Sequence, residues 1–196
     1  MFISLEGIDG SGKTTQAKLL AEELGSDAIL VREPGGTPAS ERIRELLADP
    51  AIPLDRCTEL LLFCAARAQL IAEVINPALG REATVICDRY SDSSIAYQGG
   101  GRGLGADYVR QLCNATTGGL WPELTILLWV EPEAALRRTE GDDRFEAEGI
   151  EFQRGVAAAY RELAEQEPGR IRLVDAEGPV DEVHQAVMAE LAKVTA

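Results

Sequence analysis

The sequence lacks any long apolar stretch, and no run approaches the ~18 consecutive apolar residues that a membrane-spanning helix needs. Its first residues, MFISLEG, carry no basic segment and reach an acid and a glycine at once, which is not the pattern of a signal peptide. These two absences argue against a membrane partner and predict a cytoplasmic location.

The sequence also has few residues of the kinds that build metal, redox or histidine-based sites. None of the four cysteines, Cys57, Cys64, Cys87 and Cys113, belongs to a C-x-x-C pair, so neither a zinc site nor a dithiol redox site is indicated. His184 is the only histidine, and it lies near the end of the chain, far from every motif described below. Catalysis by cysteine or histidine is therefore not expected.

Positive charge is scarce as well. The chain has 19 Lys and Arg residues against 33 Asp and Glu residues, which gives a formal net charge of −14. A field of that sign repels nucleic-acid backbones, so no nucleic-acid partner is expected. Any phosphate that the protein binds must be held by local cations and backbone N–H groups.

What the sequence does have is a regular alternation of short apolar runs and longer amphipathic stretches. The runs, rich in Val, Ile and Leu, predict strands at 2–6, 28–32, 84–88, 124–130 and 170–175. The stretches between them predict helices at 13–24, 39–48, 56–79, 106–116, 133–139, 149–167 and 180–193. Alternation over the whole length predicts one α/β domain, residues 1–196, with a parallel sheet flanked by helices.

Two segments look like mobile loops. Residues 98–103, QGGGRG, contain too much glycine to hold one conformation alone. Residues 140–143, EGDD, are polar and lie between two expected helices.

The strongest motif is GIDGSGKT at residues 7–14, which fits G-x-x-x-x-G-K-[ST] between a strand and a helix. Its glycines let successive N–H groups converge on a phosphate, at the positive end of the helix that follows. In such loops the lysine reaches the β- and γ-phosphates and the hydroxyl residue binds Mg²⁺. The alternative is a glycine-rich turn with an incidental lysine. The residues predicted to bind ATP are Gly7, Ile8, Asp9, Gly10, Ser11, Gly12, Lys13, Thr14 and Thr15.

Two further segments indicate which reaction the loop serves. Residues 32–38 read REPGGTP, and residues 88–99 read DRYSDSSIAYQG. With the phosphate loop, the LLFCAAR segment at 61–67 and the DRFE segment at 143–146, they resemble the signature of bacterial thymidylate kinases over essentially the whole chain.

This resemblance implies a P-loop nucleoside monophosphate kinase fold with a five-stranded parallel sheet. It implies transfer of phosphate from ATP to dTMP, giving dTDP for dTTP synthesis, with Mg²⁺ as cofactor. It also implies a homodimer that packs its long middle helices together. Two alternatives stay open, a kinase for another nucleoside monophosphate and a nucleotide-binding homologue that has lost catalysis.

Asp88 and Arg89 come directly after the third expected strand, where open α/β sheets place their ligands. A guanidinium there can hold a phosphate bidentately. The resemblance implies that Arg89 holds the dTMP phosphate and that Asp88 lies near the Mg²⁺, with Thr14. The alternative is an ion pair that only caps the strand end.

Phe63 and Arg67 are four residues apart and so share one face of an expected helix. A ring beside a planar cation suits a pyrimidine, since one can stack and the other can bind a base carbonyl. Without the resemblance, Phe63 would be read as a core residue. The residues predicted to bind dTMP are Asp9, Glu33, Pro34, Phe63, Arg67, Arg89, Ser94, Tyr97 and Gln98.

A last cation is needed on the migrating phosphate. Some thymidylate kinases carry an arginine in the phosphate loop, where this chain has Gly10, so the resemblance implies an arginine supplied by a small lid at about 137–149. That lid segment looks short. Arg138 and Arg144 are the candidates, with Arg137 a weaker third, and the alternative is that each is an exposed arginine in a surface ion pair. Lys13 and Arg89 complete the predicted catalytic set.

Overall fold

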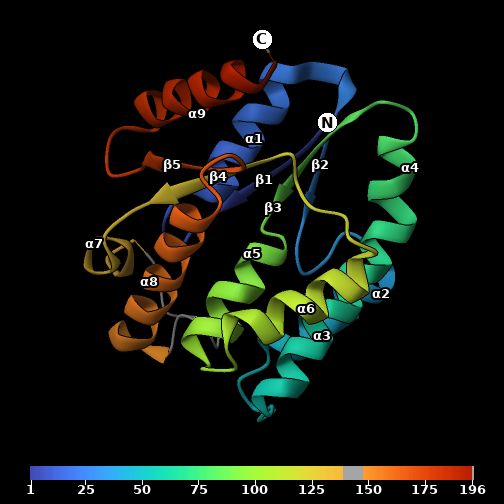
Figure 1. Ribbon diagram of the computed structural model, residues 1–196, viewed down its shortest axis with the longest axis vertical. Coiled ribbons are helices and arrows are strands. Elements are labelled where there is room, and N and C mark those ends of the chain that lie inside the picture. Colours follow the sequence, from blue (N-terminus) through green and yellow to red (C-terminus); the bar gives the residue numbers. More distant parts are fainter. Residues whose placement is uncertain (139–147, 196) are drawn as a thin grey trace.

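The computed structural model describes residues 1–138 and 148–195. Within them, five parallel strands form one sheet in the order β2-β3-β1-β4-β5 (Figure 1). The strands are β1 (Phe2–Glu6), β2 (Ala28–Arg32), β3 (Thr84–Asp88), β4 (Leu124–Trp129) and β5 (Ile171–Asp175). The predicted α/β class and all five predicted strands are confirmed, with β4 ending one residue earlier and β5 beginning one residue later than expected.

Helices flank the sheet (Figure 1). They are α1 (Lys13–Leu24), α2 (Pro38–Ala48), α3 (Arg56–Leu70), α4 (Asn76–Leu79), α5 (Ser91–Ser94), α6 (Ala106–Thr117), α7 (Pro132–Leu136), α8 (Ile150–Gln166) and α9 (Val180–Thr195). Helical segments that are not α-helical are η1 (Gly25–Asp27), which is a 3₁₀ turn, and η2 (Ile71–Ile75) and η3 (Ile95–Gly101), which are π-helical.

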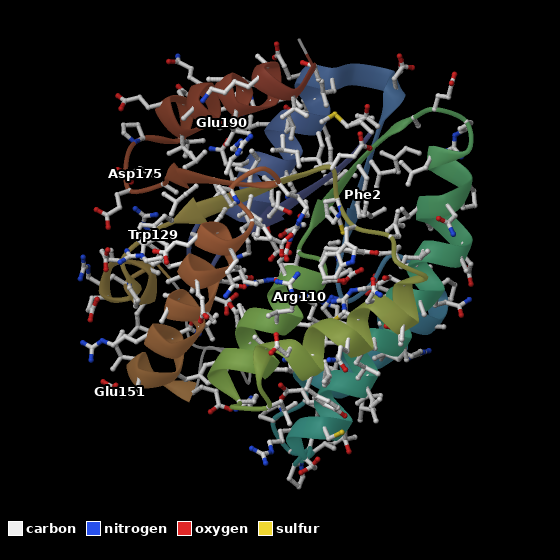
Figure 2. All side chains as sticks on the ribbon, viewed as in Figure 1. Phe2, Arg110, Trp129, Glu151, Asp175 and Glu190 are labelled. Atoms are coloured by element: carbon white, nitrogen blue, oxygen red, sulfur yellow. The ribbon has the colours of Figure 1, made fainter. Side chains whose placement is uncertain are left out.

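The central strand β1 is buried along its whole length, as expected for a strand covered on both faces. Phe2, at the start of β1, packs edge-on against Tyr90, with ring centroids 4.9 Å apart. By contrast with this buried ring, the charged Glu151 on α8 lies at the surface (Figure 2). The polar Ser4 is tolerated inside the sheet because its hydroxyl bonds that of Thr125 at 2.9 Å.

Local sequence explains where several helices begin. The Thr37 hydroxyl accepts a hydrogen bond from the backbone N–H of Ser40 at 3.1 Å, and Pro38 occupies the first turn of α2. The Asp55 carboxylate caps α3 by accepting from the N–H of Cys57 at 2.8 Å.

The helix predicted at 56–79 is not continuous, because η2 interrupts it between α3 and α4. Pro77 lies just beyond this π-helical turn. Proline has no N–H to donate to the carbonyl four residues earlier, and its ring crowds that carbonyl, so regular α-helical bonding breaks on the N-terminal side of it.

The prediction of a mobile loop at 98–103 is wrong, because Ile95–Gly101 forms η3 and both Gln98 and Gly99 are buried. The glycines serve close packing here. A Cβ on Gly100 would lie 2.6 Å from the Cβ of Ala159 in α8, and one on Gly101 would lie 2.6 Å from the ring of Phe152. The second predicted loop, 140–143, lies outside the described residues.

Three neighbouring strands end in the segments that the motifs singled out. Residues 7–12 follow β1, residues 33–37 follow β2, and Arg89 follows β3. Because β2, β3 and β1 are adjacent, these segments meet at one edge of the sheet. Among the described residues, no helix has both the length and the apolar character needed to cross a bilayer.

Candidate functional site

The phosphate loop joins β1 to α1, and Lys13 is the first residue of that helix. Gly10 has a φ of 78°, and a Cβ there would lie 2.4 Å from the carbonyl oxygen of Ala135 in α7. Backbone conformation and contact both restrict this position to glycine. An arginine at this point of the loop is therefore sterically excluded.

The Lys13 side chain is folded back into its own loop. Its Nζ donates to the carbonyl of Ile8 at 2.7 Å and to the hydroxyl of Ser11 at 3.4 Å. Burial, with the nearby charge of Arg89, lowers the pKa of Lys13 to about 8. Lys13 is thus a cation at neutral pH, held at the centre of the loop.

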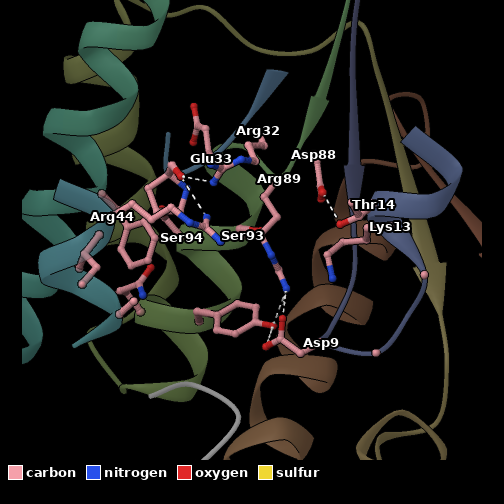
Figure 3. Close-up of a pocket in the computed structure, with 18 of the residues that line it drawn as sticks. Asp9, Lys13, Thr14, Arg32, Glu33, Arg44, Asp88, Arg89, Ser93 and Ser94 are labelled. Carbon is pink, nitrogen blue, oxygen red and sulfur yellow. Dashed lines mark hydrogen bonds and ion pairs between the residues drawn. The ribbon is translucent and has the colours of Figure 1, made fainter. Parts of the chain in front are cut away.

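Thr14 and Asp88, the two predicted metal ligands, are brought together. The Thr14 hydroxyl donates to Oδ2 of Asp88 at 2.6 Å, from the start of α1 to the end of β3 (Figure 3). Oxygen atoms of this kind are what Mg²⁺ prefers, and Mg²⁺ sites commonly combine one or two such ligands with water and substrate phosphates. The pair therefore fits the predicted cofactor.

Arg89 lies between β3 and α5 in the left-handed region, with a φ of 70°. Its guanidinium pairs with Asp9 in the phosphate loop (Figure 3) and donates to the hydroxyls of Tyr97 at 3.1 Å and Ser93 at 3.2 Å. The Tyr97 ring also lies under the guanidinium, at 4.9 Å from its centroid. These contacts fix Arg89 at the mouth of the phosphate loop.

Asp9 is the acid that looks out of place in an anion-binding loop. Its second oxygen accepts from the hydroxyl of Tyr97 at 2.8 Å. Burial alone would raise the pKa of Asp9, but the charges of Arg89 and Lys13 and the hydrogen bond from Tyr97 hold it below its ordinary value. Asp9 is therefore an ionised partner that orients Arg89.

A second carboxylate, Glu6, stands behind Arg89 and was not anticipated from the sequence. It is fully buried and accepts from the backbone N–H of Tyr90 at 2.7 Å, the hydroxyl of Ser93 at 2.6 Å and the hydroxyl of Tyr160 at 2.8 Å. Burial and the charge of Asp92 raise the pKa of Glu6 to about 7. Because Arg89 donates to the Ser93 hydroxyl, Glu6 supports the arginine through that side chain.

Arg67 forms a separate and sealed cluster. Its side chain is 1% exposed and donates to Glu33 at 2.7 Å, to the carbonyl of Tyr90 at 3.2 Å, to the hydroxyl of Ser94 at 2.9 Å and to the sulfur of Cys113 at 3.4 Å. Burial raises the pKa of Glu33 to about 7, although the charge of Arg67 opposes the shift.

These groups surround a cavity of about 440 Å³. Most predicted site residues line it: Asp9, Gly10, Gly12, Lys13, Thr14, Thr15, Glu33, Pro34, Phe63, Asp88, Arg89, Ser94, Tyr97 and Gln98. Gly7, Ile8 and Ser11 form the turn behind the lining. Arg67 also lies behind it, one layer below Ser94.

Arg138, one of the two predicted lid arginines, is not brought to the cavity. Arg138 donates to the carbonyls of Ala176 and Glu177, both at 3.2 Å, in the segment after β5. It does not line the cavity. Arg144 lies outside the described residues, so its role stays a prediction.

Sequence reasoning also missed residues on α2. Arg44 and Leu47 line the cavity, and Arg44 donates to the carbonyl of Pro34 at 3.1 Å. They are three residues apart and share a helix face, which is a signal that helical periodicity could have supplied. The local sequence does not indicate that this face of α2 is oriented toward the cavity, because the orientation depends on packing against α3.

Comparisons with known proteins agree with this geometry. A family model described as thymidylate kinase matches residues 5–187. Thymidylate kinases of Deinococcus radiodurans and Syntrophotalea carbinolica are 45% and 48% identical, with 98% and 93% of this chain and 97% and 90% of those proteins covered. A crystal structure of thymidylate kinase from Ehrlichia chaffeensis superposes with a TM-score of 0.83 at 36% identity, covering 97% of this chain and 98% of that one.

Proposed function

We propose that this chain, which belongs to the thymidylate kinase family, transfers the γ-phosphoryl group of ATP to dTMP and releases ADP and dTDP. The observation that carries the proposal is the position of Arg89. It stands between the phosphate loop and the base-side end of one cavity, held by Asp9 and Tyr97. A cation placed there can hold the acceptor phosphate in line with a triphosphate bound by the loop.

The proposed reaction needs no covalent intermediate on the protein. The phosphate of dTMP is already a nucleophile, so no general base is needed. Lys13 and Arg89 supply positive charge on the two sides of the transferred group, which is where phosphoryl transfer builds up negative charge. Asp9, Ser93 and Tyr97 keep Arg89 in place before substrate arrives.

Mg²⁺ belongs to the proposal as cofactor, with Thr14 and Asp88 as the residues that would hold it. Within residues 1–138 and 148–195, no cluster of three or more Asp, Glu, His or Cys side chains could bind a metal ion alone. A shared site, completed by phosphate oxygens and water, fits this sparse set of protein ligands. When bound, Mg²⁺ neutralises charge on the triphosphate.

On the base side, we propose that thymine lies against Phe63, with Ser94 and Gln98 beside it and Arg67 behind. Pro34 and Glu33 close the cavity from the loop after β2. We extend the proposal to a lid at about 137–149 that excludes water and supplies a further arginine, Arg138 or Arg144.

We propose that the protein acts in the cytoplasm as a homodimer. Leu61 on α3 is 50% exposed and Tyr108 on α6 is 49% exposed, and α3 and α6 pack against each other. Large apolar side chains exposed on adjacent helices are typical of a surface that another chain covers. Sedimentation of the purified protein tests this part of the proposal directly.

The test of the function is Mg²⁺-dependent ADP release from ATP, with dTMP, dUMP, dCMP, dGMP or AMP as the sole acceptor. We expect turnover to be fastest with dTMP. Faster turnover with another acceptor would assign a different monophosphate kinase. Measurable ATP binding with no turnover on any acceptor would contradict the enzymatic role and favour a homologue that binds nucleotides without catalysis.

A further inference from the structure

The amide of Gln98 is held from one side by a carboxylate outside the cavity lining. Gln98 lies in η3, lines the cavity and is only 1% exposed. Its Nε2 donates to Oε1 of Glu59 at 2.8 Å, and Glu59, on α3, is also 1% exposed. A carboxylate accepts hydrogen bonds and does not donate them, so it determines which end of the amide faces it.

Glu59 is itself held in place. Arg102 donates from Nε to Oε1 and from Nη2 to Oε2, both at 3.2 Å. The Arg102 guanidinium also lies over the ring of Phe152 at 4.7 Å and pairs with Glu148, two residues before α8 begins. Both carboxylate oxygens are therefore engaged, and the Gln98 amide meets an acceptor of fixed position.

The other end of the amide is the carbonyl oxygen Oε1. Nitrogen and oxygen diverge by about 120° at a trigonal amide carbon, so a nitrogen turned toward Glu59 leaves the oxygen pointing elsewhere. None of the described residues donates a hydrogen bond to this oxygen, although the side chain lines the cavity. A carbonyl oxygen in that state at the wall of the cavity is an acceptor that a bound molecule can satisfy.

We propose that Glu59 is a positioning residue that fixes the Gln98 amide with its carbonyl oxygen toward the cavity, so that the pocket selects a pyrimidine whose ring nitrogen N3 carries a hydrogen. The proposal rests on the proposed function, in which that base is thymine. In dTMP the only N–H group of the ring is at N3. The same ring nitrogen of dCMP carries no hydrogen, so it would meet the carbonyl oxygen with a lone pair.

A purely structural role for Glu59 makes a different prediction. Buried ion pairs contribute little net stability, but removing one partner is strongly destabilising. A residue that served only to pair with Arg102 would lower the unfolding temperature when changed and would affect all acceptors alike. Selectivity between acceptor bases separates the two roles.

The test is Glu59→Gln, which keeps the size of the side chain but lets it donate as well as accept. The Gln98 amide can then rotate so that its oxygen accepts from the amide introduced at position 59 and its nitrogen faces the cavity. We expect the ratio of kcat/KM for dTMP over dCMP to fall at least about tenfold, mainly through a higher KM for dTMP. The constants for dUMP should change as those for dTMP do, because uracil shares the N3–H group.

Two controls accompany this variant. Glu167→Gln removes another carboxylate paired with two arginines, Arg110 and Arg170, away from the cavity, and should leave the selectivity ratio unchanged. Adding Glu59→Gln to Gln98→Leu should change selectivity no further, since Glu59 acts through Gln98.

If Glu59→Gln does not fold, Arg102→Gln takes its place. Without Arg102, Glu59 loses the two hydrogen bonds that hold its carboxylate, so the Gln98 amide is no longer oriented and the ratio should again fall. An unchanged ratio in the variant that folds, or an equal loss for every acceptor, overturns the inference while the proposed function stands. Absence of dTMP turnover in the unmodified protein overturns the proposed function itself.

Discussion

Two arginine–carboxylate pairs lie at the same cavity, and they differ in how much of each side chain is exposed to solvent. The Arg89–Asp9 pair is part-exposed, with 18% and 23% of the two side chains accessible, whereas the Arg67–Glu33 pair is sealed at 1% and 4%. An accessible arginine can exchange a carboxylate for an incoming phosphate. A sealed arginine cannot, and it fixes the shape of the wall behind Ser94 instead.

The difference follows from where the two pairs sit. Arg89 follows a strand end beside the phosphate loop, so its partners Asp9 and Tyr97 also line the cavity. Arg67 comes from the inner face of α3 and does not line the cavity itself, although its partners Glu33 and Ser94 do. We therefore expect loss of Arg89 to act mainly on turnover and loss of Arg67 to act mainly on folding.

The largest expected effect is on catalysis in Arg89→Ala. Loss of a cation that contacts the transferred group should lower kcat/KM for dTMP by about 1,000-fold or more. Steady-state kinetics with dTMP as acceptor measures it. Arg154→Ala, which removes an exposed arginine paired with Glu133 and Glu151, is the control and should keep full activity. A loss smaller than about tenfold for Arg89→Ala would contradict the proposed phosphate grip.

The next effect is on stability in Arg67→Met. This change leaves Glu33 buried without its arginine, which should lower the free energy of unfolding by about 3–5 kcal/mol. Urea unfolding measures the loss. Adding Glu33→Gln should restore part of it, because no ionisable group is then left unpaired. A stability loss no greater than that of Arg89→Ala would remove the distinction between the two pairs.

The smallest expected effect, taken over a single pH unit, is the pH dependence of stability. In the folded protein Glu6 and Glu33 have pKa values raised from 4.5 to about 7, mainly by burial. Between those values the folded state binds protons that the unfolded state has released. The free energy of unfolding should therefore fall as pH rises from about 5 to about 8, by at most about 1.4 kcal/mol per pH unit for each carboxyl.

Substitution identifies the groups responsible for this slope. Glu6→Gln and Glu33→Gln should each flatten it, while the same change at the exposed Glu165 should leave it as it was. A slope that both buried variants keep in full would show that other groups carry the pH dependence.

The strands and the phosphate loop could be predicted because their signals are local. Short apolar runs indicate the strands of a parallel sheet that is covered on both faces. The spacing of glycine and lysine in residues 7–14 is typical of a phosphate-binding loop between a strand and a helix. Since the carboxyl ends of parallel strands share an edge, the meeting of Asp9, Glu33 and Arg89 also followed from the sequence.

What could not be predicted depends on packing between distant segments. The glycines at 100 and 101 look flexible in isolation, and only the approach of α8 shows that they permit contact with Ala159 and Phe152. Glu6 ends an apolar strand and carries no motif, so its support of the Arg89 segment appears only when Ser93 and Tyr160 are in place.

The most direct test of the division between the two pairs is a comparison of dTMP and thymidine, which differ only by the phosphate. Isothermal titration calorimetry should show that the unmodified protein binds dTMP at least about 100-fold more tightly than thymidine, as a charge-assisted bidentate contact allows. In Arg89→Ala most of that difference should disappear, while thymidine binds as before. If Arg89→Ala still prefers dTMP by the same factor, the phosphate is held elsewhere and the role assigned to Arg89 is wrong.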